Sequence, residues 1–178
     1  GKYFREAASP LPSLQYFKPQ YIPLSKPHPL WTTCGDNSFE VSKAIVQAKL
    51  LSGRYRTDKL LGHFDKTDGI CSLCSSGVPG SLEHLLALCP ALEPCRRKQF
   101  ETLEKMSNTS REIIIEASQD SVSNFVHILL DCSSAPNVIM AYQQYGYNIL
   151  HEIFKFTRTC MVLQHSCNKN ENDRTMEE

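Results

Sequence analysis

The chain has 178 residues, 41% of them hydrophobic, and its 19 Lys and Arg side chains balance its 19 Asp and Glu side chains. This composition is typical of a globular protein, and the zero net charge argues against a protein that coats nucleic acid over its whole surface. No apolar run approaches the ~20 residues that cross a bilayer, and no signal peptide is visible, so we expect no membrane contact and an intracellular location, in nucleus or cytoplasm. Because the chain begins at Gly1 rather than Met, we expect it to be a piece of a longer protein.

Charge is distributed unevenly along the chain. Residues 1–66 carry ten basic and five acidic side chains, whereas residues 67–178 carry nine basic and fourteen acidic ones. The stretch 112–154 contains no Lys or Arg. Because opposite charges on two halves of a chain suit different partners, we expect RNA or DNA at the basic region 43–98 and consider a protein partner for 112–154.

The predicted elements begin with an extended arm over residues 1–37. Its six prolines exclude long helices, and its aromatic residues favour packing against the rest of the chain. A helix is predicted from Ser38, capped by Asn37 or Ser38 and ended by Gly53. The apolar face that we expect this helix to bury consists of Val41, Ala44, Ile45, Ala48 and Leu51.

The rest of the pattern predicts a mostly α fold without a strand pair. A short helix follows Thr57 or Asp58, a loop covers 65–80, and Ser81 caps a helix that Pro90 interrupts. Further helices are expected at about 91–106, 111–118, 122–132, from Pro136, and at 149–163, before a polar tail that we expect to be disordered. In segments, the prediction is an arm (1–37), a basic helical segment (38–66), a zinc unit with its following helix (67–98), a helical segment (99–167) and an acidic disordered tail (168–178).

Four candidate metal ligands occur within nineteen residues, with the spacing C-x2-C-x9-H-x4-C. They are Cys71, Cys74, His84 and Cys89. Three thiolates and one imidazole form a common structural zinc set, and because protein fills all four positions no site remains for activating water. The spacing therefore predicts a structural zinc ion, with Cys89 at a frayed helix end. The alternatives are free thiols with packing roles for His84 and Cys89, or Cys95 as a substitute ligand.

The remaining cysteines do not suggest a second metal site. Cys160, His165 and Cys167 are only three candidates with poor spacing, so we interpret them as part of a helix end. Cys34 and Cys132 are interpreted as buried thiols. The missing signal peptide favours reduced cysteines over a disulfide framework.

The residue patterns of common catalytic sites are absent from the sequence. There is no Gly-rich phosphate loop, no G-x-S-x-G, no H-E-x-x-H and no adjacent Asp pair for two magnesium ions. We therefore expect that this chain is not an enzyme.

Basic side chains cluster on both sides of the predicted zinc unit. The first group is Lys43, Lys49, Arg54, Arg56, Lys59 and Lys66, and the second is Arg96, Arg97 and Lys98. If the zinc unit folds back on the first group, the two groups could form one surface that faces phosphates. The alternative is a solvated helix face without a ligand.

Short segments around the cysteines resemble a known family. They are 24–31 (LSKPHPLW), 40–43 (EVSK), 51–56 (LSGRYR), 81–85 (SLEHL), 89–92 (CPAL), 145–146 (YG) and 156–159 (FTRT). With the cysteine cluster they are similar to the C-terminal region of non-LTR (LINE-type) retrotransposon reverse transcriptases of animals, over about residues 11–163. The resemblance implies a CCHC zinc knuckle-like unit and a role in holding template RNA or target DNA during target-primed reverse transcription. It places the zinc ligands at the four residues named above and nucleic-acid contacts at Arg54 and Arg56.

The chain also departs from that family. The polymerase palm with its catalytic aspartates and the endonuclease are missing, and residues 168–178 are acidic where the family often continues with basic and aromatic residues. The resemblance therefore implies a non-catalytic fragment of an RNA-directed DNA polymerase. The alternatives are a zinc-stabilised protein-interaction module and an inert decayed or host-captured relic.

Overall fold

The computed structural model describes residues 16, 28, 30, 36–65, 68–74, 76–106, 112, 119, 121–131 and 148–175. Its helices are α3 (Ser38–Leu51), α4 (Asp58–Asp65), the π-helical turn η3 (His84–Leu88), the 3₁₀ turn η4 (Pro90–Leu92), α5 (Glu93–Met106), α7 (Val122–Leu130) and α9 (Asn148–Thr175). Over these described ranges no strand is present, only an isolated antiparallel bridge between Ile70 and Pro79. The prediction of a mostly α fold is confirmed.

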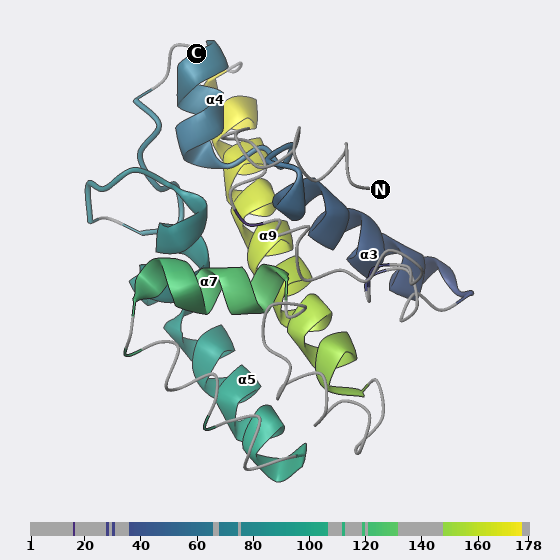
Figure 1. The fold of residues 1–178 in the computed structure, drawn as a ribbon. Coiled ribbons are helices and arrows are strands. Elements are labelled where there is room, and N and C mark those ends of the chain that lie inside the picture. The colour runs from purple at the N-terminus through teal and green to yellow at the C-terminus, as the bar shows by residue number, and fades with distance from the viewer. Residues whose placement is uncertain are drawn as a thin grey trace, which may run out of the picture.

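The long helix α9 forms the centre of the molecule. Figure 1 shows α3 lying along one side of α9, α5 along the other, and α7 crossing near its middle; both α3 and α5 contact α9. The most deeply buried apolar side chains come from all of these helices and from η3, and they include Leu50, Leu85, Leu103, Leu130 and Ile153. One core therefore joins the helices to the segment that carries the predicted zinc ligands.

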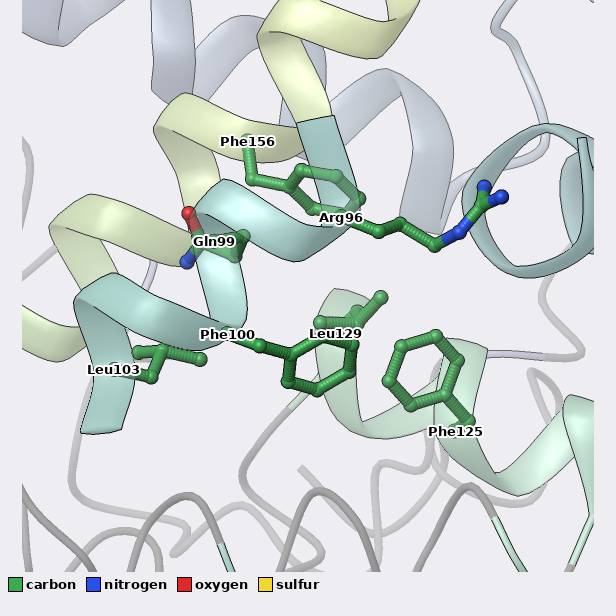
Figure 2. A pocket seen from close by; sticks show the side chains of 7 residues that line it. All are labelled: Arg96, Gln99, Phe100, Leu103, Phe125, Leu129 and Phe156. Atoms are coloured by element: carbon green, nitrogen blue, oxygen red, sulfur yellow. The ribbon is translucent and has the colours of Figure 1, made fainter. Parts of the chain in front are cut away.

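Aromatic packing fills the space between α5, α7 and α9. The rings of Phe100 and Phe125 are stacked, with centroids 6.1 Å apart and planes 23° apart. Figure 2 shows these two rings side by side near Leu129, with Phe156 reaching in from α9. The cavity left among these side chains is only about 10 Å³, room for no more than one water molecule. These side chains therefore fill the space enclosed among them, while a second hollow of about 260 Å³ opens beside Phe100 and Phe125.

The buried face of α3 differs from the predicted one. Val41 is 38% exposed and Ile45 is 46% exposed, so the expectation that both are buried was wrong. The buried face instead consists of Lys43, Ala44, Gln47, Leu50 and Leu51. The helical spacing was predicted correctly. The buried face is rotated relative to the predicted one because it includes two polar residues, Lys43 and Gln47.

A hydrogen-bond network explains how Gln47 can be fully buried. Its amide Nε2 donates to the backbone carbonyls of Leu129 and Leu130, both at 2.9 Å. Its Oε1 accepts from the Thr157 hydroxyl on α9, also at 2.9 Å. A buried amide is tolerated when its donors and acceptor have partners, and here the partners lie on two other helices. Gln47 thus fixes how α3, α7 and α9 meet.

The ends of α3 are formed as the sequence predicts. At the start, the Asn37 side chain accepts from the backbone N–H groups of Phe39 and Glu40 at 3.1 and 3.0 Å. At the end, Gly53 has φ 62°, the Gly53 N–H donates to the Leu50 carbonyl at 3.1 Å, and the Arg54 N–H donates to the Lys49 carbonyl at 2.8 Å. These two bonds form a Schellman motif, which stops the helix and sets the direction of residues 54–56.

Replacing Gly53 by Ala should lower the free energy of unfolding by about 1 kcal/mol, because a Cβ disfavours the left-handed conformation that this glycine adopts. Gly53→Asn should cost less, since Asn tolerates that conformation. Urea unfolding of both variants at fixed zinc concentration would test this. An alanine variant as stable as the wild type would contradict the role given to Gly53.

Two expected boundaries differ from the structure. The helix α9 continues to Thr175, so the expectation of a disordered tail from Asn168 was wrong as far as Thr175; no Pro or Gly interrupts 148–175. The helix α5 runs through the boundary predicted between 98 and 99. The helices predicted at 111–118 and from Pro136, and most of the arm 1–37, lie outside the described residues.

Candidate metal centre

The first two ligands come from a tight loop that folds back on itself. The Ile70–Pro79 bridge closes it, and the Cys71 N–H donates to the Val78 carbonyl at 2.9 Å. Gly77, inside the loop, has φ 68°, a turn conformation that glycine adopts without strain. This loop is the one predicted between 65 and 80, and it places Cys71 and Cys74 beside the helical turn that follows.

The other two ligands lie at the two ends of the π-helical turn η3. Ser81 begins this segment as predicted: its hydroxyl accepts from the His84 N–H at 3.2 Å. Residues five apart in an α-helix are rotated by about 500°, so they point to different sides. The turn instead forms an i→i+5 bond, from the Cys89 N–H to the His84 carbonyl at 2.6 Å. This wider turn brings both side chains to one side.

Cys89 is therefore not at a frayed end, and that expectation was wrong. Its side chain is fully buried and its N–H is bonded. Pro90 follows as the first residue of η4, where its missing N–H costs nothing. The proline ends the π-helical turn without loosening it.

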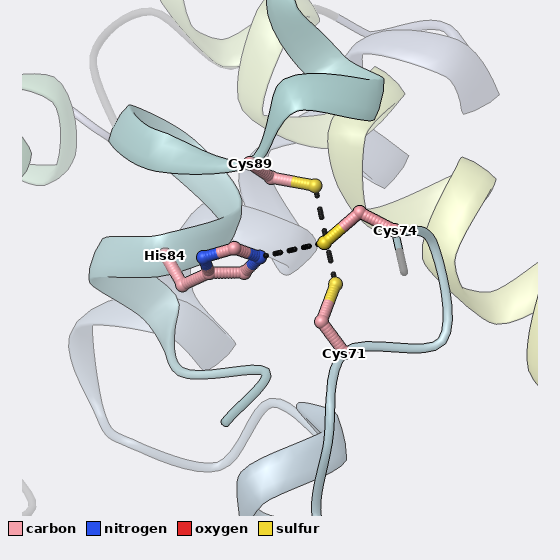
Figure 3. A group of neighbouring side chains, drawn as sticks. All are labelled: Cys71, Cys74, His84 and Cys89. Carbon is pink, nitrogen blue, oxygen red and sulfur yellow. Dashed lines mark hydrogen bonds between the residues drawn. The ribbon is translucent and has the colours of Figure 1, made fainter. Parts of the chain in front are cut away.

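The four ligand atoms meet in one place. They all lie within 4.8 Å of one another, with 3.9 Å between the sulfurs of Cys71 and Cys89 and 3.3 Å between the Cys74 sulfur and His84 Nε2. In a tetrahedral zinc site, metal–ligand lengths of ~2.3 Å for sulfur and ~2.1 Å for nitrogen place sulfurs ~3.8 Å apart and sulfur and nitrogen ~3.5 Å apart. Figure 3 shows the four side chains converging from the loop and the turn. The group can hold a metal ion with tetrahedral geometry.

The other candidate ligands stay outside this group. Cys95 does not belong to it, and Cys160, His165 and Cys167 do not form a second group of ligand atoms in the described part of the chain. All six described cysteines are free thiols. Cys34 and Cys132 lie outside the described residues.

The three thiols of the group differ in acidity. Burial raises the pKa of Cys71 to about 12 and also raises the pKa of Cys89. At Cys74 the raising effect of burial is outweighed by hydrogen bonds from the Ser76 hydroxyl and backbone and from His84, so that its pKa falls to about 6. Cys74 is thus the thiol that ionises first, and a bound cation would displace the protons of the other two. Metal affinity should therefore rise with pH.

Arg96 contacts the backbone of Cys89, the last of the four candidate ligands. Its guanidinium Nη2 donates to the backbone carbonyl of Cys89 and pairs with Glu93 at 3.1 Å. The side chain is only 7% exposed. The prediction of Arg96 as a nucleic-acid contact was wrong: its charge is used inside the protein, where it orients the last ligand.

Asp58 connects the loop that carries Cys71 and Cys74, here called the metal loop, to its own helix α4 and to α9. Its Oδ2 accepts from the backbone N–H and the hydroxyl of Ser72, at 2.9 and 3.1 Å, and its Oδ1 accepts from Gln164 Nε2 on α9, at 2.9 Å. Gly80 lies so close that an added Cβ would be 2.6 Å from the Asp58 Cβ. Only a helix-capping role was predicted for Asp58, because nothing local reveals partners 14 and 106 residues away.

The predicted basic residues do not form one surface. Arg54, Arg56, Lys59, Arg97 and Lys98 are exposed. The first three stand between α3 and α4 or on α4, whereas the last two stand on α5, and Figure 1 places α4 and α5 toward opposite ends of α9. The expectation of a joint surface was therefore wrong.

Two further members of the basic groups, Lys43 and Lys66, are not among these exposed cations. Lys43 is 1% exposed and pairs with Glu40 at 2.7 Å, so it does not face solvent. Lys66 lies outside the described residues. The exposed cations next to the metal loop are thus Arg54, Arg56 and Lys59, with Lys49 one helical turn before them.

A groove opens beside this segment, with Lys59 in its lining but neither Arg54 nor Arg56. It has a volume of about 630 Å³ and lies between the end of α3, the helix α4 and residues 81–83. Its lining includes Tyr55, Lys59, His63 and Glu83. The Lys59 N–H donates to the Gly80 carbonyl at 3.3 Å, so the wall formed by α4 is bonded to the metal-bearing wall.

No protein-family model, curated protein or solved structure matches this chain. None of the helices in the described ranges is long and apolar enough to cross a membrane. The function is therefore inferred from the geometry of the site.

Proposed function

We propose that the chain is a zinc-stabilised helical module that binds RNA or DNA through the cations beside its metal loop. In this proposal it is the non-catalytic C-terminal part of a retrotransposon reverse transcriptase and assists target-primed reverse transcription. The observation that carries the proposal is the exposure of Arg54, Arg56 and Lys59 on one short segment, in which Asp58 is hydrogen-bonded to Ser72 of the loop that carries Cys71 and Cys74. Exposed guanidinium and ammonium groups are the groups that bind the phosphates of nucleic acid.

The donor set supports zinc as the resident ion. Three thiolates and one imidazole suit zinc and do not suit magnesium or calcium, which prefer oxygen ligands. All four positions are taken by Cys71, Cys74, His84 and Cys89, so zinc here would stabilise structure and not supply a reactive water. Its contribution to binding would be to hold the groove wall in place.

The test is binding of a labelled oligonucleotide to the zinc-loaded chain over a series of salt concentrations. Arg54→Gln with Arg56→Gln should weaken binding for every sequence and flatten the slope of log K against log salt by about two, because each removed cation takes about one phosphate contact with it. Fluorescence anisotropy would measure both quantities.

The matched control is Arg97→Gln with Lys98→Gln, which removes two exposed charges on α5, away from the groove. This variant should keep nearly the wild-type salt slope. Equal effects of the two double variants would show that general charge and not the groove drives binding. Absence of salt-dependent binding by the wild type at low ionic strength would overturn the proposal.

A protein-interaction module is the second candidate. It is favoured by the exposed apolar residues Val41 and Ile45 on the outer side of α3. Exposed apolar side chains that repeat on one helical face are typical of contact surfaces. Nuclease-resistant capture of a partner that Val41→Ser with Ile45→Ser abolishes, in a chain that does not bind oligonucleotides, would favour this candidate.

A further inference from the structure

The three cysteines of the metal centre differ in how far solvent can reach them. Cys71 is 3% exposed and Cys89 is fully buried, whereas Cys74 is partly exposed. The residues that follow Cys74 in the metal loop, 76–79, are exposed as well. A small dissolved molecule that reaches the centre therefore meets the Cys74 sulfur before the other two.

A hydroxyl group stands beside this accessible sulfur. The Ser76 Oγ lies 2.8 Å from the Cys74 Sγ. Because Ser76 is exposed, its hydroxyl lies where a molecule from solvent would approach the sulfur. A hydroxyl in that position can donate to an oxygen atom that gains negative charge during a reaction at the sulfur.

A second cysteine lies within reach of Cys74 on the same loop. The ligand atoms of the centre all lie within 4.8 Å of one another, so Cys71 and Cys74 would need to close a gap of less than about 3 Å to reach the disulfide length of ~2.05 Å. Figure 3 shows these two cysteines on the loop and Cys89 on the neighbouring turn. The Cys89 N–H is bonded to the His84 carbonyl, which holds that residue to its turn. Cys71 is therefore the better partner for Cys74.

From these observations we infer that Cys74 is a site of reversible oxidation by hydroperoxides such as hydrogen peroxide, with Cys71 as the partner that completes a disulfide. In the zinc-loaded chain both sulfurs are thiolates. The Cys74 thiolate attacks one peroxide oxygen, the O–O bond breaks, and the other oxygen leaves as hydroxide beside the Ser76 hydroxyl, so that Cys74 becomes a sulfenic acid.

The second step closes the disulfide. The Cys71 thiolate attacks the Cys74 sulfur, the S–O bond of the sulfenic acid breaks, and its oxygen leaves as a second hydroxide. In total, two thiolates and one hydrogen peroxide give one disulfide and two hydroxide ions. The two sulfurs lose the two electrons that the peroxide gains.

The consequence of this step is loss of the metal. The disulfide takes two of the four ligands, and His84 with Cys89 alone is too small a set for a structural zinc site. Oxidation should therefore release zinc, and reduction by a dithiol should restore zinc binding. The inference rests on the zinc of the proposed function and does not depend on nucleic-acid binding.

The experiment treats the zinc-loaded full chain with excess hydrogen peroxide, with and without dimedone, a reagent that traps sulfenic acids. A zinc-sensitive dye follows metal release, and fragmentation of the tryptic peptide 67–96 locates the modified cysteines. We expect dimedone on Cys74, and in its absence a disulfide between Cys71 and Cys74, release of zinc, and recovery after dithiothreitol. Dimedone on Cys71 or Cys89 in place of Cys74 would overturn the inference, and this arm needs no protein variant.

A ligand exchange tests the role of the accessible thiol separately from zinc binding. Cys74→His keeps four sulfur and nitrogen ligands but should release zinc at least about tenfold more slowly under peroxide. Cys167→Ser, which removes a partly exposed thiol outside the metal group, should release zinc like the wild type.

Two results separate the inference from the proposed function. A wild type that keeps its zinc and its free thiols under peroxide, or a Cys74→His chain that releases zinc at the wild-type rate, would overturn the inference and leave the proposed function standing. A wild type that holds no zinc before peroxide is added would overturn the zinc-stabilised module of the proposed function, and the inference with it.

Discussion

Cys71→Ser is expected to abolish zinc binding and the cooperative unfolding of the zinc-loaded chain. The Cys71 side chain is 3% exposed, and its sulfur lies 3.9 Å from that of Cys89. Structural zinc in small units contributes ~10–16 kcal/mol to folding, comparable to the whole stability of a domain. Because the same π-helical turn carries His84 and the core residues Leu85 and Leu86, loss of the ion should also expose apolar core.

Thermal unfolding followed by circular dichroism, with zinc content measured on the same samples, would check this. The matched control is Cys167→Ser, which changes the same chemical group on α9 outside the metal group and should melt like the wild type. A Cys71→Ser chain that keeps the wild-type melting temperature would refute a structural role for the ion.

Asp58→Ala is expected to lower the free energy of unfolding by about 3 kcal/mol. The substitution removes the carboxylate that the Ser72 N–H, the Ser72 hydroxyl and the buried Gln164 amide all contact, and losing the partner of such donors costs ~1–3 kcal/mol. It also removes an acidic group from the first turn of α4, where the helix dipole favours one. Asp58→Asn, which keeps one carbonyl oxygen, should cost less.

Urea unfolding at fixed zinc concentration would measure these differences. Asp36→Ala, which removes an exposed carboxylate, is the matched control and should be within about 0.5 kcal/mol of the wild type. If Asp58→Ala is equally harmless, the metal loop does not depend on α4 and α9 as the structure indicates.

Local features of the fold could be predicted from the sequence because they depend on neighbouring residues. The cap at Asn37, the stop at Gly53 and the start at Ser81 each need only the chemistry of one side chain and its nearest backbone groups. The cysteine cluster was predictable for the same reason, since its four ligands lie within nineteen residues.

The burial of Gln47 and of Arg96 was not predicted because it depends on long-range contacts. Gln47 is buried because it bonds residues 82, 83 and 110 positions away, and no hydropathy pattern contains that information. Arg96 is identical in type to its exposed neighbour Arg97, and only the carbonyl of Cys89 beside it decides that one is internal. The interval between His84 and Cys89 does contain a usable signal, because an x4 spacing suits a π-helical turn better than an α-helical one.

Cys71, Cys74, His84 and Cys89 are expected to hold one structural zinc ion together. Native mass spectrometry of the full chain, purified with zinc present and then freed of excess metal, tests this most directly. The predicted result is one zinc per chain for the wild type and for Cys167→Ser, and none for His84→Ala. A folded wild-type chain without zinc, or a His84→Ala chain that retains it as tightly, would contradict the account.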